Sequence, residues 1–147
     1  MIIEVKDYTD MNILGTTLDD AAGECFDKVG RVMGLPYPGG KAVDMLAGEG
    51  NKHAILFPSP SINKETLDFS FSGLKTAVIN YLNTKNQKGE EISRPDVCAS
   101  LTYTITESIK EKVGRAIKES GYKKVVVAGG VSANSHIRRE LKSLCDS

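Results

Sequence analysis

An apolar residue stands at every fourth position through one long stretch of this sequence. The stretch predicts a helix from Arg94 or Pro95 to about Glu119, because a spacing of four keeps side chains on one face of an α-helix. Gly121 is expected to end this helix. The stripe is expected to lie in the core, and it consists of Val97, Leu101, Ile105, Ile109, Val113 and Ile117.

Two shorter helices are expected in the N-terminal third of the chain. The first begins at an N-cap on Thr16 or Thr17 and runs to about Met33, where Gly34 and the prolines behind it prevent continuation. The second covers AVDMLA, residues 42–47, after the turn PYPGG. The apolar face of the first helix would carry Leu18, Ala22, Cys25, Val29 and Val32.

Strands, loops and one more helix account for the next segments. Residues 1–14 alternate like two short strands around Asp7, or like one strand with a tight bend, and residues 48–68 are rich in loop-forming residues. A helix then opens near Ser72 and gives way to the polar linker NTKNQKGEE. One face of that helix is expected to carry Leu74, Ala77, Val78, Tyr81 and Leu82.

The C-terminal segment predicts an α/β layer. KKVVVA, residues 123–128, reads as a short buried strand, and a last helix from Ser132 to Leu144 would face the sheet with Ile137, Leu141 and Leu144. Because the chain starts within a strand and stops after a helix, we expect a fragment, a single partial domain over 1–147. Its expected parts are a strand-helix-turn segment over 1–47, a loop-rich insertion with one helix over 48–92 and a helix-strand-helix segment over 93–147.

Composition argues against several functional classes. The 147 residues carry 19 basic and 19 acidic side chains, so no global charge favours nucleic acid or a membrane surface, although a local basic patch is compatible with this balance. No apolar run reaches the roughly 20 residues of a membrane span, and no leader precedes the first strand, so a cytoplasmic protein is expected. Reduced thiols are expected at Cys25, Cys98 and Cys145, which form no CxxC pair.

The turn PYPGG has two adjacent glycines before a helix. It is not a phosphate-binding P-loop, because five residues separate Gly34 from Gly40 and Lys41 is followed by alanine. A helix stop explains the prolines but not both glycines. Gly39 and Gly40 could let an anionic ligand lie against bare backbone at a helix N-terminus.

Charged residues near two helix starts have a structural and a ligand-binding interpretation. Asp19 is expected in the first turn of its helix, where it complements the helix dipole. Asp27 lies beyond the first turn and could accept hydrogen bonds from a ribose diol. Lys75 opposes the dipole of its own helix, so it is either a solvated lysine or, with Ser72, a contact to RNA or to another phosphate.

The segment VVVAGGVSAN offers a ligand pocket or an ordinary turn. Ligands of parallel α/β sheets sit beyond the carboxyl ends of strands, and Gly129 and Gly130 would leave room there beside Asn134. Helix packing alone can also demand glycine. His53 and His136 are the only histidines and lie far apart in the sequence, so no metal site is expected from this chain.

Three segments in their observed order resemble one family. They are LGTTLDDAAGECFDKVGRVMGLPYPGG, DFSFSGLKT and VVVAGGVSAN. Together they resemble the universal tRNA threonylcarbamoyladenosine transferase family (TsaD), whose members were once described as O-sialoglycoprotein endopeptidases, from about Met11 to Arg139. The resemblance implies an α/β fold that is a partial second lobe of the ASKHA (actin-like ATPase, ribonuclease-H-like) architecture, with a helical elaboration.

The resemblance also implies an activity and its ligands. The family transfers threonylcarbamoyl from threonylcarbamoyl-AMP to N6 of the adenosine beside the anticodon in tRNAs reading ANN codons. ATP, ADP or threonylcarbamoyl-AMP is the implied nucleotide, and tRNA and the bacterial-type proteins of the threonylcarbamoyl complex are the implied partners. The family's adenylate contacts fall here on Asp27, Gly40, Asp44 and Asn134, and Gly129–Gly130 would form the floor for the adenosine.

The chain departs from the family pattern at the metal. In the family, an upstream histidine pair, an SGGH turn and a late aspartate hold a metal, Fe or Zn, near the phosphates. None of these motifs is in this sequence. We therefore expect the chain to be inactive by itself. A metal-dependent glycoprotein endopeptidase, the older label of the family, and a non-catalytic interaction module that could form a homodimer are the alternatives.

Overall fold

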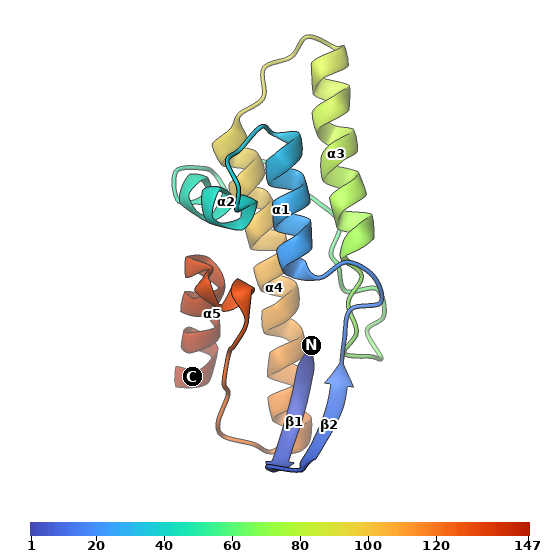
Figure 1. The fold of residues 1–147 in the computed structure, drawn as a ribbon, viewed down its shortest axis with the longest axis vertical. Coiled ribbons are helices and arrows are strands. Elements are labelled where there is room, and N and C mark those ends of the chain that lie inside the picture. Colours follow the sequence, from blue (N-terminus) through green and yellow to red (C-terminus); the bar gives the residue numbers. More distant parts are fainter.

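The helix predicted from the apolar stripe is α4, Arg94–Ser120, and it runs through the middle of the molecule (Figure 1). This computed structural model describes residues 1–147. The Ser93 hydroxyl caps α4 by accepting the Asp96 N–H, and Gly121 ends it in the left-handed conformation with φ 75°. Both ends therefore follow from the sequence as expected.

Three helices form a layer with α1 at its centre. Helix α1 (Ala22–Val32) packs against α2 (Gly39–Ala47) on one side and α3 (Phe71–Gln87) on the other (Figure 1), and α2 makes the close backbone contact with α4. The predicted cap of the first helix is wrong, since Ala21 occupies that position and the Thr17 hydroxyl instead bonds to the Asp20 carbonyl. Because α1 starts later than predicted, Leu18 falls outside it and is 65% exposed. The helix α3 continues into the segment predicted as a linker.

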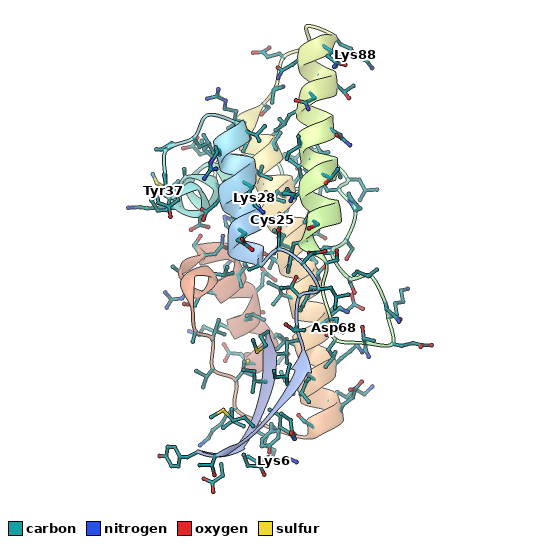
Figure 2. The ribbon with its side chains drawn as sticks, turned by 45° about the vertical axis from the view of Figure 1, so that its right-hand side comes forward. Lys6, Cys25, Lys28, Tyr37, Asp68 and Lys88 are labelled. Atoms are coloured by element: carbon teal, nitrogen blue, oxygen red, sulfur yellow. The ribbon has the colours of Figure 1, made fainter.

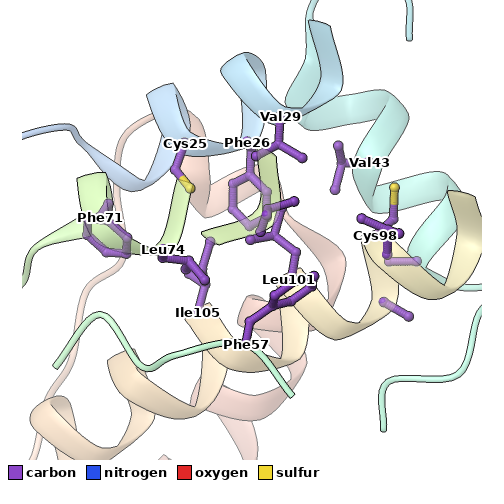
Figure 3. Close-up of a cluster of buried hydrophobic side chains, with 14 of the residues drawn as sticks. Cys25, Phe26, Val29, Val43, Phe57, Phe71, Leu74, Cys98, Leu101 and Ile105 are labelled. Carbon is purple, nitrogen blue, oxygen red and sulfur yellow. The ribbon is translucent and has the colours of Figure 1, made fainter. Parts of the chain in front are cut away.

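One hydrophobic cluster joins these helices. Its centre is formed by Phe26 and Val29 of α1, Val43 of α2, Leu74 of α3 and Leu101 of α4 (Figure 3). Only the first half of the predicted stripe is fully buried. The loop of residues 59–69 lies over the second half of α4, and it buries polar side chains of that helix.

A buried lysine marks this second half of α4. Lys112 is 0% exposed, and its ammonium group donates hydrogen bonds to the carbonyl oxygens of Asn63 at 3.2 Å and Thr66 at 2.8 Å. Burial lowers the pKa of Lys112. Arg115, one turn on, also donates to the Thr66 carbonyl, so two cations hold this loop through its backbone.

The two predicted N-terminal strands form a hairpin. Strand β1 (Ile2–Asp7) pairs antiparallel with β2 (Asp10–Gly15), with Ile3 opposite Ile13 and Asp7 opposite Asp10. No other strand joins this sheet. The structure thus has an α/β composition of five α-helices and one two-stranded sheet.

The predicted strand at 123–128 is wrong. This segment is irregular and exposed, with Val126 at 90% exposure, because no neighbouring strand is present to pair with its backbone. The last helix, α5 (Ser135–Asp146), follows the 3₁₀ turn η1 (Gly130–Ala133). Ile137 and Leu141 of α5 pack in the helical core against α4 and not on a sheet.

The segment 48–68 has no helix or strand, as predicted. Its anchor on α4 is a close contact at Gly50, where a Cβ atom would lie 2.0 Å from the Pro95 carbonyl oxygen. The Asn51 N–H donates to the Asp96 carboxylate at 2.8 Å beside it. None of the helices is apolar over a length that would cross a bilayer.

Candidate functional site

Asp27 lies on α1 and faces the first turn of α2. Its Oδ1 accepts the Gly40 N–H at 2.9 Å. The N-cap of α2 is Pro38, whose side chain cannot accept a hydrogen bond, so the carboxylate of another helix takes this role. The other oxygen of Asp27, Oδ2, accepts no hydrogen bond within the chain.

The two glycines of the turn differ in what they require. A Cβ atom on Gly39 would lie 3.0 Å from the Asp27 Cα, and one on Gly30 would lie 3.1 Å from the Gly39 Cα. The close approach of α1 and α2 therefore explains Gly39. A Cβ atom on Gly40 would meet only ordinary contacts, the nearest at 3.7 Å, so packing gives no reason for glycine at that position.

Asp44 joins α2 to the start of α5. Its carboxylate accepts the Ser135 N–H at 3.1 and 3.2 Å and the Ser135 hydroxyl at 2.8 Å. His136 Nε2 lies 3.9 Å from the same carboxylate. Both oxygens of Asp44 are therefore engaged in holding the N-terminus of α5.

Asn134 is the N-cap of α5. Its Oδ1 accepts the N–H groups of His136 at 3.1 Å and Ile137 at 3.0 Å, and the residue is 7% exposed. Because the oxygen is used in this way, the amide Nδ2 is the only polar group of the side chain that remains for a ligand. Asn134 can therefore act toward a ligand as a hydrogen-bond donor, and not as an acceptor.

Gly129 and Gly130 lead into η1. Gly129 has φ 91° and ψ 178°, a backbone conformation that favours glycine, and its carbonyl accepts the Ser132 N–H at 3.1 Å. No atom lies within 4 Å of the position that a Cβ atom would occupy on either glycine. The space above them is open. On the next residue, Val131 approaches the start of α1, where a Cβ atom on Gly23 would lie 3.5 Å from its methyl group.

These contacts bring most of the predicted nucleotide-binding residues to one region. The Asp27–Gly40 bond joins α1 to α2, and the Asp44–Ser135 bonds join α2 to the residue after Asn134. The contact of η1 with α1 closes the arrangement next to Gly129–Gly130. Sequence reasoning missed Ser135, because its partner Asp44 lies 91 residues away in the chain.

Ser72 and Lys75 lie in a separate cluster, where α1 approaches α3. The prediction that Asp19 lies in the first turn of α1 is wrong. Asp19 instead caps α3. Its Oδ1 accepts the N–H groups of Phe71 at 2.8 Å and Ser72 at 3.1 Å, and its Oδ2 accepts the Ser70 hydroxyl. Capping explains this aspartate more fully than the dipole of its own helix, because α1 begins only at Ala22.

Asp20 bridges two lysines beside that cap. Its two oxygens lie 2.9 Å from the Lys28 ammonium and 2.8 Å from the Lys75 ammonium. Figure 2 shows Lys28 on α1 close to Cys25. The hydrogen bonds from Lys75 and Lys28 lower the pKa of Asp20. The cation at Lys75 is thus compensated by Asp20, a partner that the sequence did not reveal.

The cysteines and histidines add no reactive cluster. Burial raises the pKa of Cys25 and Cys98 to about 12, which leaves these thiols protonated at neutral pH, and Cys145 is exposed. No three side chains of His, Cys, Asp and Glu gather as a metal site requires.

Comparison with known proteins gives one consistent result. The sequence matches the family described as TsaD, tRNA N6-adenosine threonylcarbamoyltransferase, over residues 1–147. Proteins named tRNA N6-adenosine threonylcarbamoyltransferase from Clostridium botulinum (strain 657 / Type Ba4) and Clostridioides difficile (strain 630) are 49% identical over 98% and 97% of this chain. The one from Moorella thermoacetica is 51% identical over 97% of the chain. The aligned region is 42% of the length of each of these relatives.

Proposed function

The chain belongs to the tRNA N6-adenosine threonylcarbamoyltransferase family, and from this membership we propose that it forms the nucleotide-binding lobe of such an enzyme. The whole enzyme would transfer threonylcarbamoyl from threonylcarbamoyl-AMP to N6 of the adenosine beside the anticodon in tRNAs reading ANN codons. The chain spans about 42% of the length of its relatives, and it would act as part of an ASKHA-type second lobe in the cytoplasm.

The observation that carries this proposal is the set of unused groups around one region. Asp27 keeps a free oxygen, Asn134 keeps a free amide donor, and Gly40 and Gly130 have no packing reason to be glycine. All of them belong to segments that the contacts of α1, α2 and α5 draw together. A ligand that offers hydroxyl donors, an acceptor and a flat face would use each of these groups.

An adenylate meets that description. A ribose hydroxyl would donate to Asp27 Oδ2, and Asn134 Nδ2 would donate to an acceptor on the ligand. The adenosine would lie on Gly129–Gly130, where no Cβ atom intervenes. Bound threonylcarbamoyl-AMP supplies the activated carbamoyl carbon. The contribution of these residues is to bind and orient the adenylate, so that the attacking amine meets that carbon in a fixed direction.

The residues present do not fit the family's Fe or Zn. The structure brings no three His, Cys, Asp or Glu side chains together, so we assign no step to a metal held by this chain. We propose that the chain alone does not catalyse the transfer, and that activity depends on tRNA and on the partner proteins of the threonylcarbamoyl complex. Detection of threonylcarbamoyl transfer to tRNA by the purified chain alone would contradict this proposal.

Calorimetric titration of ADP tests the adenosine site. The variant Asn134→Asp keeps an oxygen that can accept the His136 and Ile137 N–H groups, but it replaces the amide donor with a second oxygen. We expect it to retain α5 and to lose ADP binding, whereas Asn134→Ala loses both the cap and the donor. Asn83→Asp, on the exposed side of α3, gives the same charge change outside the site. ADP binding by Asn134→Asp at the affinity of the unaltered chain would contradict the assignment, and so would a lack of binding by the unaltered chain.

A further inference from the structure

A hollow lies between α3 and the segment of residues 55–58. Its volume is about 380 Å³, and none of the residues assigned above to the adenylate lines it. Residues 77, 80, 81, 84, 85 and 88 of its lining are three or four positions apart, so they form one continuous face of α3 and its C-terminal cap. No acidic residue is present in α3. This face of α3 thus lines the hollow with polar and basic side chains.

The hollow has one partly exposed aromatic ring, that of Tyr81, which packs on the buried Phe57. Phe57 and Tyr81 pack edge to face with their ring centroids 5.8 Å apart, and Phe57 reaches into the hydrophobic core beside Leu101 (Figure 3). Phe57 is therefore fixed by the core. Its contact holds the Tyr81 ring in one orientation at the surface.

The polar groups lie to one side of this ring. Asn80 provides an exposed amide, and Thr84 provides a hydroxyl one turn farther along α3. Lys85 lies 5.8 Å from the Tyr81 ring centroid and forms an ion pair with Glu90. Lys88 makes no ion pair and stands at the far end of α3 (Figure 2). With two lysines and one acid, this end of the hollow is positively charged.

We propose that this hollow binds a single nucleotide, with the base against the ring of Tyr81 and the phosphate at Lys85 and Lys88. An aromatic ring binds the face of any base, an amide can read a base edge, and lysines contact phosphate. The volume lies in the range of small-ligand sites. The nucleotide can be a free mononucleotide or an unpaired residue of an RNA. This site is separate from the proposed adenylate site and does not depend on it.

Fluorescence anisotropy of a labelled single-stranded RNA oligomer, with unlabelled AMP as competitor, tests the site in the complete chain. We expect the double variant Lys85→Gln, Lys88→Gln to bind the RNA more weakly. The slope of the logarithm of its binding constant against the logarithm of the salt concentration should be less steep by about 1.4, which is about 0.7 for each lost phosphate contact. Asn80→Ala should also weaken binding. Lys118→Gln with Lys123→Gln removes the same charge at exposed positions outside the hollow and should leave the affinity unchanged.

Tyr81 distinguishes a base site from a merely basic surface. Tyr81→Leu should lower the affinity for the RNA by about fivefold or more, since fivefold corresponds to the smallest loss expected from removing one base–aromatic stack. Tyr81→Phe should bind the RNA as the unaltered chain does. Competition by AMP would identify a mononucleotide as sufficient, and binding of the oligomer alone would identify RNA as the source. The proposal would be overturned if the lysine variants and their control bound equally, or if neither probe bound. It would also be overturned if a polyglutamate peptide displaced the RNA while Tyr81→Leu had no effect.

Discussion

Three aspartates of this chain cap helices to which they do not belong. Asp19 caps α3, Asp27 caps α2 and Asp44 caps α5. Each carboxylate meets unpaired N–H groups at the positive end of a helix dipole, a contact that stabilises a helix by about 1 kcal/mol. The three differ in their second oxygen, which is occupied in Asp19 and Asp44 and free in Asp27. Asp27 is therefore the carboxylate best suited to bind a ligand.

The neighbouring Asp20 gives a pH prediction. Hydrogen bonds from Lys75 and Lys28 lower the pKa of Asp20 in the folded chain below its value in the unfolded chain. A lowered pKa stabilises the fold above the unfolded value, about 3.9, and this contribution is lost as the pH falls through the folded value. We expect Asp20→Asn to be less stable than the unaltered chain at pH 7, with the difference shrinking below about pH 4.

Urea unfolding at a series of pH values measures this difference. The companion variant Asp10→Asn removes a carboxylate of the hairpin that forms no ion pair, and it controls for the loss of one negative charge. A constant difference between the Asp20→Asn variant and the unaltered chain from pH 7 down to about pH 2 would show that the two lysines do not stabilise the folded carboxylate.

At the scale of elements, the loop after α2 depends on one glycine. Gly50 lies against the start of α4, and a Cβ atom there would be 2.0 Å from the Pro95 carbonyl oxygen. The adjoining bonds, from Asn51 N–H to Asp96 and from Ile55 N–H to the Ser100 hydroxyl at 3.2 Å, require the same close approach. We expect Gly50→Ala to destabilise the chain by about 1–3 kcal/mol, because the backbone must shift to relieve the clash.

Gly73 provides the matched control. It lies inside α3 with nothing within 4 Å of a Cβ position, so Gly73→Ala should stabilise the chain by about 0.5–1 kcal/mol through helix propensity. Free energies of unfolding measured in urea compare the two variants. Hydrogen exchange should also locate the loss in Gly50→Ala to residues 50–55 and the start of α4. Equal stabilities for the two alanine variants would contradict the packing seen at Gly50.

The elements predicted correctly are those whose stabilising residues lie close together in the sequence. The helix α4 was predicted to within a residue at each end, because its apolar stripe and Gly121 are local features of the sequence. The strand at 123–128 was predicted wrongly, because a strand is stabilised by a partner and none is present to pair with it. The role of Asp19 could not be read locally either, since the helix that it caps begins about fifty residues later.

The candidate site shows the same division. Resemblance to a family indicated Asp27, Gly40 and Asn134, and the structure brings their segments together through contacts that no single segment predicts. Sequence reasoning could not separate Gly39 from Gly40, because the difference lies in the approach of α1 to α2. Whether these residues bind an adenylate remains the proposal that the ADP titration tests.

At the scale of the whole molecule, the helices are well covered by one another and the strands are not. The hairpin β1–β2 and the segment before η1 both run beside the lower half of α4, the hairpin over and to the right of the helix and the segment to its left in Figure 1. Apolar side chains are exposed on both, among them Val5 at 53%, Ile13 at 64% and Val126 at 90%. Both outer edges of the hairpin also carry unpaired backbone groups, which can pair with another chain.

We therefore expect the chain to self-associate through this surface as its concentration rises. Ile13→Lys on the hairpin and Val126→Lys on the irregular segment should each suppress the association, because an added charge disfavours pairing of an exposed backbone edge with another chain. Leu56→Lys, at a residue that is 99% exposed on another part of the molecule, controls for added charge alone. Multi-angle light scattering over a concentration series gives the mass of each variant. A monomeric mass for the unaltered chain at every concentration would contradict an association through the hairpin. Equal suppression of the association by Leu56→Lys would contradict it too, because the effect would then come from added charge alone.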